Sequence, residues 1–397
     1  MKKKLLAVTL SLAVAMSLAG CGSSAAKGET AGASNDTQAA EAGNSATQED
    51  STQEGSAQKD SAQKDSEQED STQENSTQAD GSESAQSENT AKTDGKTTKL
   101  TFVLDWTPNT NHTGLYVAQE KGYFAEAGLE VEIVQPPEDG ATALVASGKA
   151  QFGVDFQDSL APAFAREDPL PVTAVAAVIQ HNTSGIISRK GEGMDTPKGM
   201  EDHVYATWDL PVEKAMIANV VAQDGGDFDK VKLIPSTVTD EVTALKSKQV
   251  DAIWVYYAWG GIATEVNDLP TDYFAFKDIN PVFDYYTPVI VANNDFLKEN
   301  PDVAKAFMSA LAKGYEDAVK DPAEAADILC KAAPELDAKL VQASQEYLKD
   351  QYQADAKSWG YIDGARWDAF YGWLNENKLV ETEIPAGWGF SNDYLPQ

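Results

Sequence analysis

The sequence predicts an α/β protein built from two lobes. Strand patterns and helical patterns alternate at short spacing from residue 98 onward, which is typical of α/β layering. All the Phe, Trp and Tyr side chains lie in residues 98–397, a stretch long enough for one large or two ordinary domains with their own cores. The last part of this stretch is mostly helical, and its helices are expected to cover one lobe or both.

The first lobe is expected to begin with a strand in which Leu100, Phe102 and Leu104 alternate with polar residues and which runs into Asp105. The following elements are then expected in order: a helix from Asn111 to about Lys121, a strand over 129–133, a helix over 141–147, a strand over 152–154, a helix over 160–166 and a strand over 172–179. In layered α/β proteins, binding sites lie at the carboxyl ends of such strands.

The second lobe is expected to repeat this alternation. Its expected elements are strands over 204–207, 231–234 and 252–255 and helices over 212–223 and 241–247, before a further strand over 288–292. We expect the chain to cross between the lobes twice, near residues 186–190 and 284–289. Lobe 1 would then hold about residues 98–187 and 290–397, and lobe 2 about residues 188–289.

The N-terminal segment has the charge order of a secretory signal. Three lysines precede an apolar run that ends in Leu18-Ala19-Gly20-Cys21, and the run is short for a membrane span. This ending resembles the lipobox of bacterial lipoproteins, which implies cleavage before Cys21, lipidation of Cys21 and anchoring on the extracytoplasmic face of the cell membrane. The alternative is an ordinary signal peptide with an incidental cysteine.

Residues 22–97 are predicted to be a disordered linker. Up to Gly95 they contain almost no apolar side chain larger than alanine, and a serine recurs every five residues between Ser51 and Ser76. A five-residue polar period matches neither helix nor strand, and burial cannot offset the entropy of ordering such a segment. The linker would reach roughly 50 Å if it behaves as a flexible chain.

Charge and motifs exclude several function classes. The 63 acidic and 31 basic side chains give a net charge of −32, which repels phosphate backbones, so the protein is not expected to bind nucleic acid. His112, His181 and His203 are the only histidines, and their spacing does not predict a zinc site. The sequence also lacks the usual hydrolase, P-loop and dinucleotide motifs, and Cys330 is interpreted as a small core residue.

Aromatic side chains next to carboxylates and amides predict the binding site. They follow the strand that runs into Asp105, lead into the helix that contains Glu213, follow the strand over 252–255 and lie near the second crossing. The candidate site residues are Asp105, Trp106, Asn109, His112, Gln157, Trp208, Glu213, Tyr257, Trp259, Asp284 and Tyr285. Flat aromatic walls with acceptors at their edges suit a flat ring that carries donors. Trp254 is expected to pack in the core.

Three stretches identify a family resemblance. Residues 121–124 (Lys-Gly-Tyr-Phe), 127–132 and 146–154 resemble the opening of substrate-binding proteins of ABC importers, in the group that binds sulfonates and thiamine precursors. Residues 104–116 narrow the resemblance to the branch that binds thiamine pyrimidine precursors, which is NMT1/THI5-like. The resemblance covers roughly residues 98–397. It implies the two-lobed type II periplasmic-binding-protein fold, a ligand cleft between the lobes, and permease and ATPase partners.

On this interpretation the ligand is an aminopyrimidine of the hydroxymethyl or formylamino type. Trp106 with Trp208 or Tyr257 would sandwich its ring. Asn109 would bind the amino edge, and Glu213 or Asp284 would accept a hydrogen bond from the amino group. We expect a monomer that binds without a cofactor, a metal or covalent chemistry.

Two alternatives remain open. One is another nitrogenous, aromatic or sulfonate ligand. A site for an oxyanion usually contains Arg or Lys, whereas the candidate loops carry acidic residues. The other is an enzyme like the yeast-type pyrimidine synthase, which uses pyridoxal phosphate, a histidine that it consumes and a Cys-rich segment. His112 falls in the corresponding region, but residues 280–292 contain no cysteine.

Overall fold

The computed structural model describes residues 97–236 and 238–396. The predicted signal segment, the lipidation site Cys21 and the predicted linker up to residue 96 lie outside the described residues. Within the part that the structure describes, no helix combines the length and the apolar character that a membrane crossing requires.

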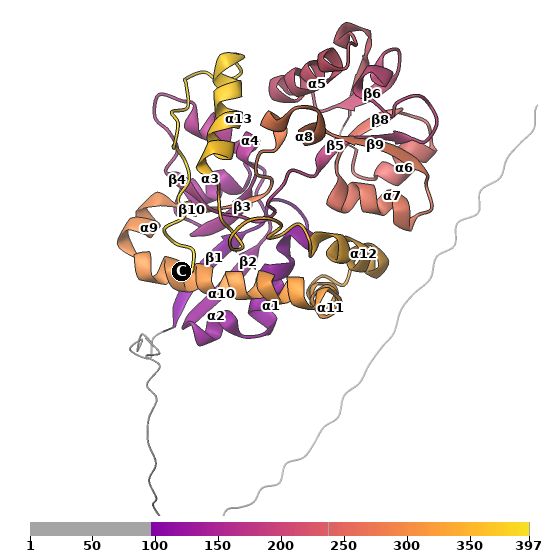
Figure 1. Cartoon of the computed structure of the whole chain (residues 1–397). Coiled ribbons are helices and arrows are strands. Elements are labelled where there is room, and N and C mark those ends of the chain that lie inside the picture. Colours follow the sequence, from indigo (N-terminus) through magenta and orange to yellow (C-terminus); the bar gives the residue numbers. More distant parts are fainter. Residues whose placement is uncertain (1–96, 237, 397) are drawn as a thin grey trace, which may run out of the picture. The chain divides into compact units, whose positions relative to one another are not determined.

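Two five-stranded sheets form the centres of the two lobes (Figure 1). The first sheet has the order β2-β1-β3-β10-β4 and the second has the order β7-β6-β8-β5-β9. The strands of the first sheet are β1 (Thr98–Val103), β2 (Leu129–Val134), β3 (Phe152–Asp155), β4 (Val172–Ala177) and β10 (Val289–Asn293). Those of the second are β5 (Ser184–Arg189), β6 (Val204–Thr207), β7 (Lys232–Pro235), β8 (Ala252–Tyr256) and β9 (Thr271–Ala275).

The two sheets share one pairing pattern. In the first, β1 pairs in parallel with β2 and β3, while β10 runs antiparallel to β3 and β4. In the second, β6 pairs in parallel with β7 and β8, while β5 runs antiparallel to β8 and β9. Because three parallel strands lie side by side in each sheet, the carboxyl ends of β1 and β3, and those of β6 and β8, meet at one edge of their sheet.

The first crossing between the lobes lies earlier than the sequence predicts. Residues 184–189 form β5, which is buried along its whole length between β8 and β9, so residues 184–187 belong to lobe 2 and not to lobe 1. The chain therefore crosses at residues 178–183, and it returns at residues 284–288 before β10. The strand β9 was not expected, because its sequence mixes polar and apolar residues without clear alternation.

Helices cover both sheets. In lobe 1 they are α1 (Thr113–Glu120), α2 (Tyr123–Glu126), α3 (Ala141–Ala146) and α4 (Gln157–Phe164). In lobe 2 they are α5 (Pro211–Gln223), α6 (Glu241–Lys246), α7 (Ile262–Val266) and α8 (Phe276–Ile279). The C-terminal part adds α9 (Asn294–Glu299), α10 (Pro301–Lys320), α11 (Pro322–Ala332), α12 (Ala338–Leu348) and α13 (Gly364–Glu376).

The long helix α10 packs closely on α1, beside which it runs in Figure 1. Two glycines permit this approach. A Cβ on Gly314 would lie 2.0 Å from the carbonyl oxygen of Gly114, and a Cβ on Gly114 would lie 2.3 Å from the ring of Tyr315. The Tyr315 hydroxyl then donates a hydrogen bond of 2.6 Å to the carbonyl of Asn111. The C-terminal helices thus fix the loop that follows β1, and α12 also contacts α7 of lobe 2.

Candidate functional site

A cavity of about 300 Å³, here called the aromatic hollow, lies between residues of the two lobes. Lobe 1 contributes Asp105, Trp106, Asn109, Asn111 and Phe156, and lobe 2 contributes Trp208, Val238, Glu241, Trp254, Val255, Tyr256, Trp259 and Gly260. These residues follow β1, β3, β6, β7 and β8 or belong to the end of β8. The hollow therefore lies at the carboxyl ends of strands, where α/β proteins place their ligands.

The loop after β1 exposes Trp106 by fixing the residues around it. Asn109 caps a short 3₁₀ turn (Thr110–His112), where its side-chain oxygen accepts from the Asn111 backbone N–H at 2.9 Å. Its side-chain nitrogen donates to the carbonyl of Thr107 at 3.0 Å. These bonds hold the polypeptide that directly follows Trp106, whose side chain remains 46% exposed. The amide of Asn109 thus serves its own loop, although Asn109 also lines the hollow.

His112 lies behind Asp105 and outside the lining of the hollow. It is fully buried, and its Nδ1 accepts a hydrogen bond from the Asn109 backbone N–H at 3.2 Å. The ring proton is therefore assigned to Nε2, which donates to Oδ1 of Asp105 at 2.6 Å. His112 thus orients the Asp105 carboxylate, and the structure gives it no contact with the hollow.

The loop after β6 presents Trp208 from the opposite lobe, and Glu213 supports this loop. The Glu213 carboxylate is buried and accepts hydrogen bonds from the backbone N–H groups of Trp208 (3.0 Å) and Leu210 (3.2 Å). It also accepts from the hydroxyls of Tyr205 (2.6 Å) and Thr207 (3.1 Å). Four donors therefore occupy Glu213, and it does not line the hollow, whereas Trp208 remains 39% exposed.

Aromatic rings from both lobes also form the inner wall of the hollow. Phe156 of lobe 1 stacks on Tyr256 of lobe 2, with ring centroids 5.3 Å apart and planes 9° from parallel. Trp254 lies 5.5 Å from Trp208 and 4.3 Å from Phe276 between ring centroids. Trp254 is buried as expected, at 5% exposure, and it nevertheless lines the hollow.

The charged groups that line the aromatic hollow are carboxylates. They are Asp105 from lobe 1 and Glu241 from lobe 2, and among the described residues that line it there is no lysine, arginine or histidine. Burial raises the pKa of Glu241, and the charge of the neighbouring Asp240 raises it further, while a backbone hydrogen bond lowers it. The hollow is therefore suited to groups that donate hydrogen bonds and unsuited to anions.

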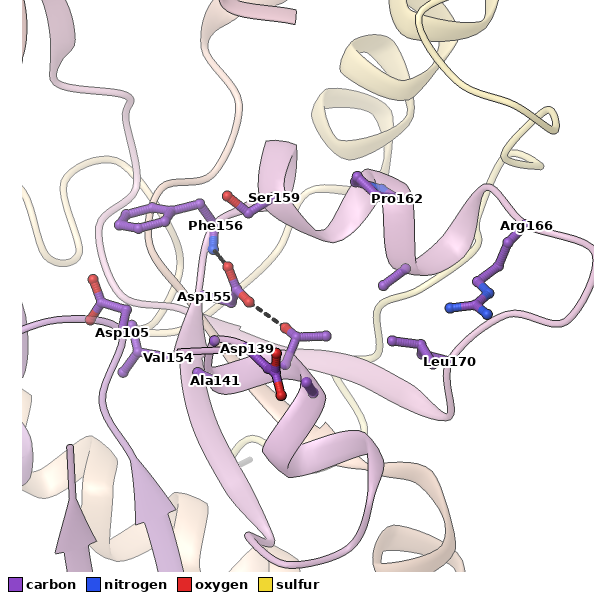
Figure 2. A pocket seen from close by; sticks show the side chains of 14 residues that line it. Asp105, Asp139, Ala141, Val154, Asp155, Phe156, Ser159, Pro162, Arg166 and Leu170 are labelled. Carbon is purple, nitrogen blue, oxygen red and sulfur yellow. Dashed lines mark hydrogen bonds between the residues drawn. The ribbon is translucent and has the colours of Figure 1, made fainter. Parts of the chain in front are cut away.

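A second cavity of about 480 Å³, here called the acidic hollow, adjoins the first and shares Asp105 and Phe156 with it. Its other lining residues are Asp139, Gly140, Ala141, Thr142, Ala143, Val154, Asp155, Ser159, Pro162, Ala163, Arg166 and Leu170. Asp155 accepts hydrogen bonds from the Phe156 N–H, at 2.8 Å, and from the Thr142 hydroxyl. Figure 2 shows the Asp155 side chain in the lining of this hollow, beside Phe156. Burial raises the pKa of Asp155 to about 6, against the opposing effect of these hydrogen bonds.

The structure places Gln157, Tyr257 and Tyr285 away from the aromatic hollow. Gln157 is fully buried and bonds the backbone of Tyr286 and Trp367. Tyr285 is also fully buried and stacks on Phe370 at 4.1 Å. Tyr257 packs on Tyr273 and Tyr347, and its hydroxyl donates to Glu265.

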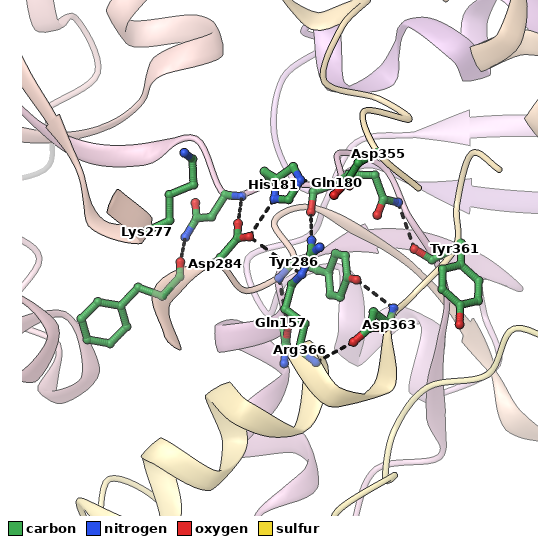
Figure 3. A network of polar contacts seen from close by, with 12 residues as sticks. Gln157, Gln180, His181, Lys277, Asp284, Tyr286, Asp355, Tyr361, Asp363 and Arg366 are labelled. Carbon is green, nitrogen blue, oxygen red and sulfur yellow. Dashed lines mark hydrogen bonds and ion pairs between the residues drawn. The ribbon is translucent and has the colours of Figure 1, made fainter. Parts of the chain in front are cut away.

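Asp284 belongs to a network that joins the two crossings, here called the hinge network (Figure 3). Its carboxylate bonds His181 Nδ1 at 2.7 Å and accepts from the Asn182 N–H at 2.9 Å, and Arg366 lies 3.8 Å away. His181 Nε2 lies 3.1 Å from Asp355. Because all these partners belong to the crossings or to residues 355–366, Asp284 has a structural environment and no contact with the hollow.

Of the eleven candidates, the structure brings five to the aromatic hollow: Asp105, Trp106, Asn109, Trp208 and Trp259. Sequence reasoning missed Phe156, Tyr256 and Glu241. Phe156 directly follows a strand, a position that could have identified it. Glu241 is the first residue of α6, where an acid is expected for its effect on the helix dipole alone. No pattern in the sequence therefore indicated that it lines the cavity.

Comparison with known proteins identifies relatives in sequence. A family model described as "NMT1/THI5 like" matches residues 109–325. The formylaminopyrimidine-binding protein of Halalkalibacterium halodurans is 31% identical over 77% of this chain and 93% of its own length. The 4-amino-5-hydroxymethyl-2-methylpyrimidine phosphate synthase THI13 of Saccharomyces cerevisiae is 27% identical over 58% of this chain and 69% of its own length.

Solved structures show the same fold. The alkanesulfonate-binding protein SsuA of Xanthomonas axonopodis pv. citri, bound to MOPS, superimposes with a TM-score of 0.57 at 12% identity, over 75% of this chain and 99% of that chain. The predicted two-lobed, type II periplasmic-binding-protein fold is therefore confirmed. The resemblance to the branch that binds pyrimidine precursors is confirmed as well.

Proposed function

This chain belongs to the NMT1/THI5-like family, and on that premise we propose that it captures an aminopyrimidine precursor of thiamine for an ABC importer. The relative from Halalkalibacterium halodurans, a formylaminopyrimidine-binding protein, supports this ligand class. The observation that carries the proposal is the aromatic hollow, because it combines flat walls from both lobes with carboxylates and lacks cationic side chains among the described residues that line it.

Trp106 and Trp208 are the proposed walls for the ring. They come from different lobes, both line the hollow, and both keep more than a third of their surface exposed. Large aromatic rings left exposed at a cavity are available to stack on a flat ligand, and each contact of this kind contributes on the order of 1 kcal/mol beyond its buried area. Trp259 and the stacked pair Phe156 and Tyr256 would enclose the ring further.

The donors of an aminopyrimidine match the acceptors of the hollow. Asp105 keeps one carboxylate oxygen beyond the oxygen that bonds His112, and Glu241 faces the same cavity from lobe 2. Either can accept from an exocyclic amino group. Asn109 can add a further contact to the ring edge through the hydrogen-bonding capacity that its loop leaves unused.

A binding role without catalysis fits these residues better than the activity of the synthase relatives. The site we propose requires only non-covalent contacts, and residues 280–292 contain no cysteine where the yeast-type synthase has its Cys-rich segment. Incubation with pyridoxal phosphate and iron should give neither an aldimine absorbance nor a pyrimidine product. Either signal would restore the enzyme alternative.

We place the protein as a monomer on the extracytoplasmic face of the cell membrane, held by a lipid on Cys21 and linked to its domain by residues 22–97. The sequence around Cys21 supports the anchor, and membership of the family supports the permease and ATPase subunits of an importer as partners. Cys21→Ser should release the protein from membranes and leave ligand affinity unchanged. Undiminished membrane association of this variant would contradict the anchor.

Calorimetric titration tests the proposed ligand class. The titrants are the hydroxymethyl, aminomethyl and formylaminomethyl forms of 4-amino-2-methylpyrimidine, with an alkanesulfonate as the competing class. We expect saturable heat with at least one pyrimidine and none with the sulfonate, because an anion would face Asp105 and Glu241 without a cation. Saturable binding of the sulfonate alone would reverse the assignment.

A further inference from the structure

The aromatic hollow has an acidic side chain from each lobe in its lining and no basic side chain among its described lining residues. Asp105 follows β1 in lobe 1, and Glu241 begins α6 in lobe 2, so two carboxylates from different lobes line one cavity of about 300 Å³. No cationic side chain accompanies them among the described residues that line it. Two carboxylates that are withdrawn from water without a cation cost free energy, unless whatever fills the cavity supplies positive charge.

Neither carboxylate is saturated by the protein. From the described residues, Asp105 accepts one hydrogen bond, which His112 donates. For Glu241 the described part of the chain supplies no side-chain donor, and its Oε1 lies 3.1 Å from where a Cβ on Gly260 would stand. An ionised carboxylate can accept about four hydrogen bonds, so both groups retain acceptor capacity toward the hollow.

Trp254 adds an independent sign of a missing partner in the same cavity. It is 5% exposed and lines the hollow, and within the described residues its indole Nε1–H has no hydrogen-bond acceptor. A buried N–H group without an acceptor destabilises the protein that carries it. The hollow thus contains two carboxylates that can accept further hydrogen bonds and one N–H group that can donate one. A ligand that matches it carries both hydrogen-bond donors and an acceptor.

We propose that the protein binds its aminopyrimidine as the pyrimidinium cation, protonated on a ring nitrogen, with Asp105 and Glu241 as counter-ions from opposite lobes. This inference rests on the proposed function and specifies the charge state of its ligand. One carboxylate accepts a charge-assisted hydrogen bond from the N–H of the protonated ring nitrogen. The second carboxylate stabilises the charge from the other lobe.

The proton balance is simple. Free 4-aminopyrimidines are mostly neutral in neutral solution, so the ring nitrogen takes up one proton from solvent when it binds, and no bond between heavy atoms changes. A neighbouring negative charge favours the cation and raises the pKa of the bound ring. Affinity should therefore fall as pH rises, between the pKa of the free ring and that of the bound ring.

Other titratable groups also face the two carboxylates. Those near Asp105 are His112, Asp155, Tyr256 and Tyr315, and Glu241 has Asp240 beside it. Asp139 and Arg166 line the adjoining acidic hollow. Burial raises the pKa of Asp155 to about 6 and also raises the pKa of Glu241. The experiment must therefore show that the proton taken up on binding lies on the ligand and not on one of these carboxylates.

The experiment is calorimetry of the full chain with 4-amino-5-hydroxymethyl-2-methylpyrimidine at about pH 7.5 in two buffers of different ionisation enthalpy. The dependence of the observed heat on the buffer gives the number of protons taken up, and we expect a value approaching about one. The ultraviolet difference spectrum of the same mixture should show the pyrimidinium form of the ligand, which places the proton on the ring.

Variants then test the counter-ions. Glu241→Gln should lower proton uptake and weaken affinity about tenfold, the factor that corresponds to one unit of ligand pKa. The matched control is Asp195→Asn, which removes an exposed carboxylate of lobe 2 outside the lining and should change neither quantity. Binding without proton uptake and with the spectrum of the neutral ring would overturn the inference and leave the proposed function standing. No heat in either buffer with any of the three pyrimidines would overturn both.

Discussion

The loop after β1 and the second crossing have similar sequences but opposite environments. The loop reads Asp105-Trp106 and the crossing reads Asp284-Tyr285-Tyr286, each a carboxylate beside aromatic rings. Trp106 is 46% exposed and faces a cavity, whereas Tyr285 and Tyr286 are fully buried. The Asp284 carboxylate bonds His181 and the Asn182 backbone, while Asp105 has one bond, from His112.

This difference teaches that residue types alone do not separate a binding site from a structural network. What separates them is how far the protein satisfies its own polar groups. The hinge network pairs Asp284 with partners from both crossings and from residues 355–366, so it has little capacity left for a ligand. The aromatic hollow leaves rings exposed and acceptors unused, and that surplus is the signature of a ligand site.

The largest expected effect is on stability, at the hinge network. Asp284→Asn removes the charge that accepts from His181 and from the Asn182 N–H. Because the side chain is about 20% exposed, the loss should be about 2 kcal/mol in the free energy of unfolding and not the larger value of a fully buried pair. Chemical denaturation measures it. An unchanged unfolding free energy would show that the network does not stabilise the crossings.

An effect of comparable size is expected on affinity, at the aromatic hollow. Trp208→Ala should weaken pyrimidine binding by roughly 1–3 kcal/mol, because it removes one wall of the proposed site, and Trp106→Ala should behave similarly. Trp388→Ala is the matched control, since Trp388 is also exposed, at 45%, and does not line the hollow. Calorimetry compares the three variants. Equal losses for Trp388 and Trp208 would remove the stacking interpretation.

Glu213→Gln tests whether Glu213 acts as a structural residue or as a ligand contact. Glu213 bonds the backbone of Trp208 but does not itself line the aromatic hollow. Its carboxylate accepts from two backbone N–H groups and two hydroxyls. A neutral amide has one acceptor oxygen in place of two and can accept only some of these hydrogen bonds, so the free energy of unfolding should fall by about 1–2 kcal/mol. The preference for an amino pyrimidine over its oxo analogue should not change. A reduced preference with unchanged stability would return Glu213 to the ligand.

The smallest effect is the pH dependence of the hinge network. Burial alone would raise the pKa of Asp284, but His181 and the backbone of Asn182 lower it below its usual 3.8. The stabilisation that the ionised carboxylate gives the folded protein is therefore fully present above pH 3.8, and it is lost as pH falls through the lowered pKa. The hydrogen bond with Asp284 raises the pKa of His181 above its usual 6.5. The stabilisation that the protonated imidazole gives the folded protein is therefore fully present below pH 6.5, and it is lost as pH rises through the raised pKa of His181. The melting-temperature difference between wild type and Asp284→Asn should therefore be greatest between these limits. A difference independent of pH would contradict the ion pair.

Sequence patterns predicted most of the fold and about half of the candidate site. The strand over 204–207 and the alternating strand of Leu100 and Phe102 have clear apolar patterns because one or both faces are buried. The strand β5 was interpreted as a crossing because its full burial depends on β8 and β9, which are distant in sequence. Local pattern does not report such pairing.

The site residues follow the same logic. Trp106 and Trp208 could be predicted because polar turn residues flank both. Gln157, Asp284 and Tyr285 could not be separated from them, because their partners lie about 100 to 210 residues away in the chain. Glu241 could not be predicted either, because it lines the aromatic hollow only through the packing of α6 against the second sheet.

The most direct test of the central claim is a crystal structure of the protein grown with 4-amino-5-hydroxymethyl-2-methylpyrimidine. We predict electron density for a flat ring between Trp106 and Trp208, with its amino edge within hydrogen-bonding distance of Asp105 or Glu241. The hinge network should keep its bonds between Asp284, His181 and Asn182. Density for the ring against Tyr257 or the hinge network, with the aromatic hollow filled only by water, would contradict the account.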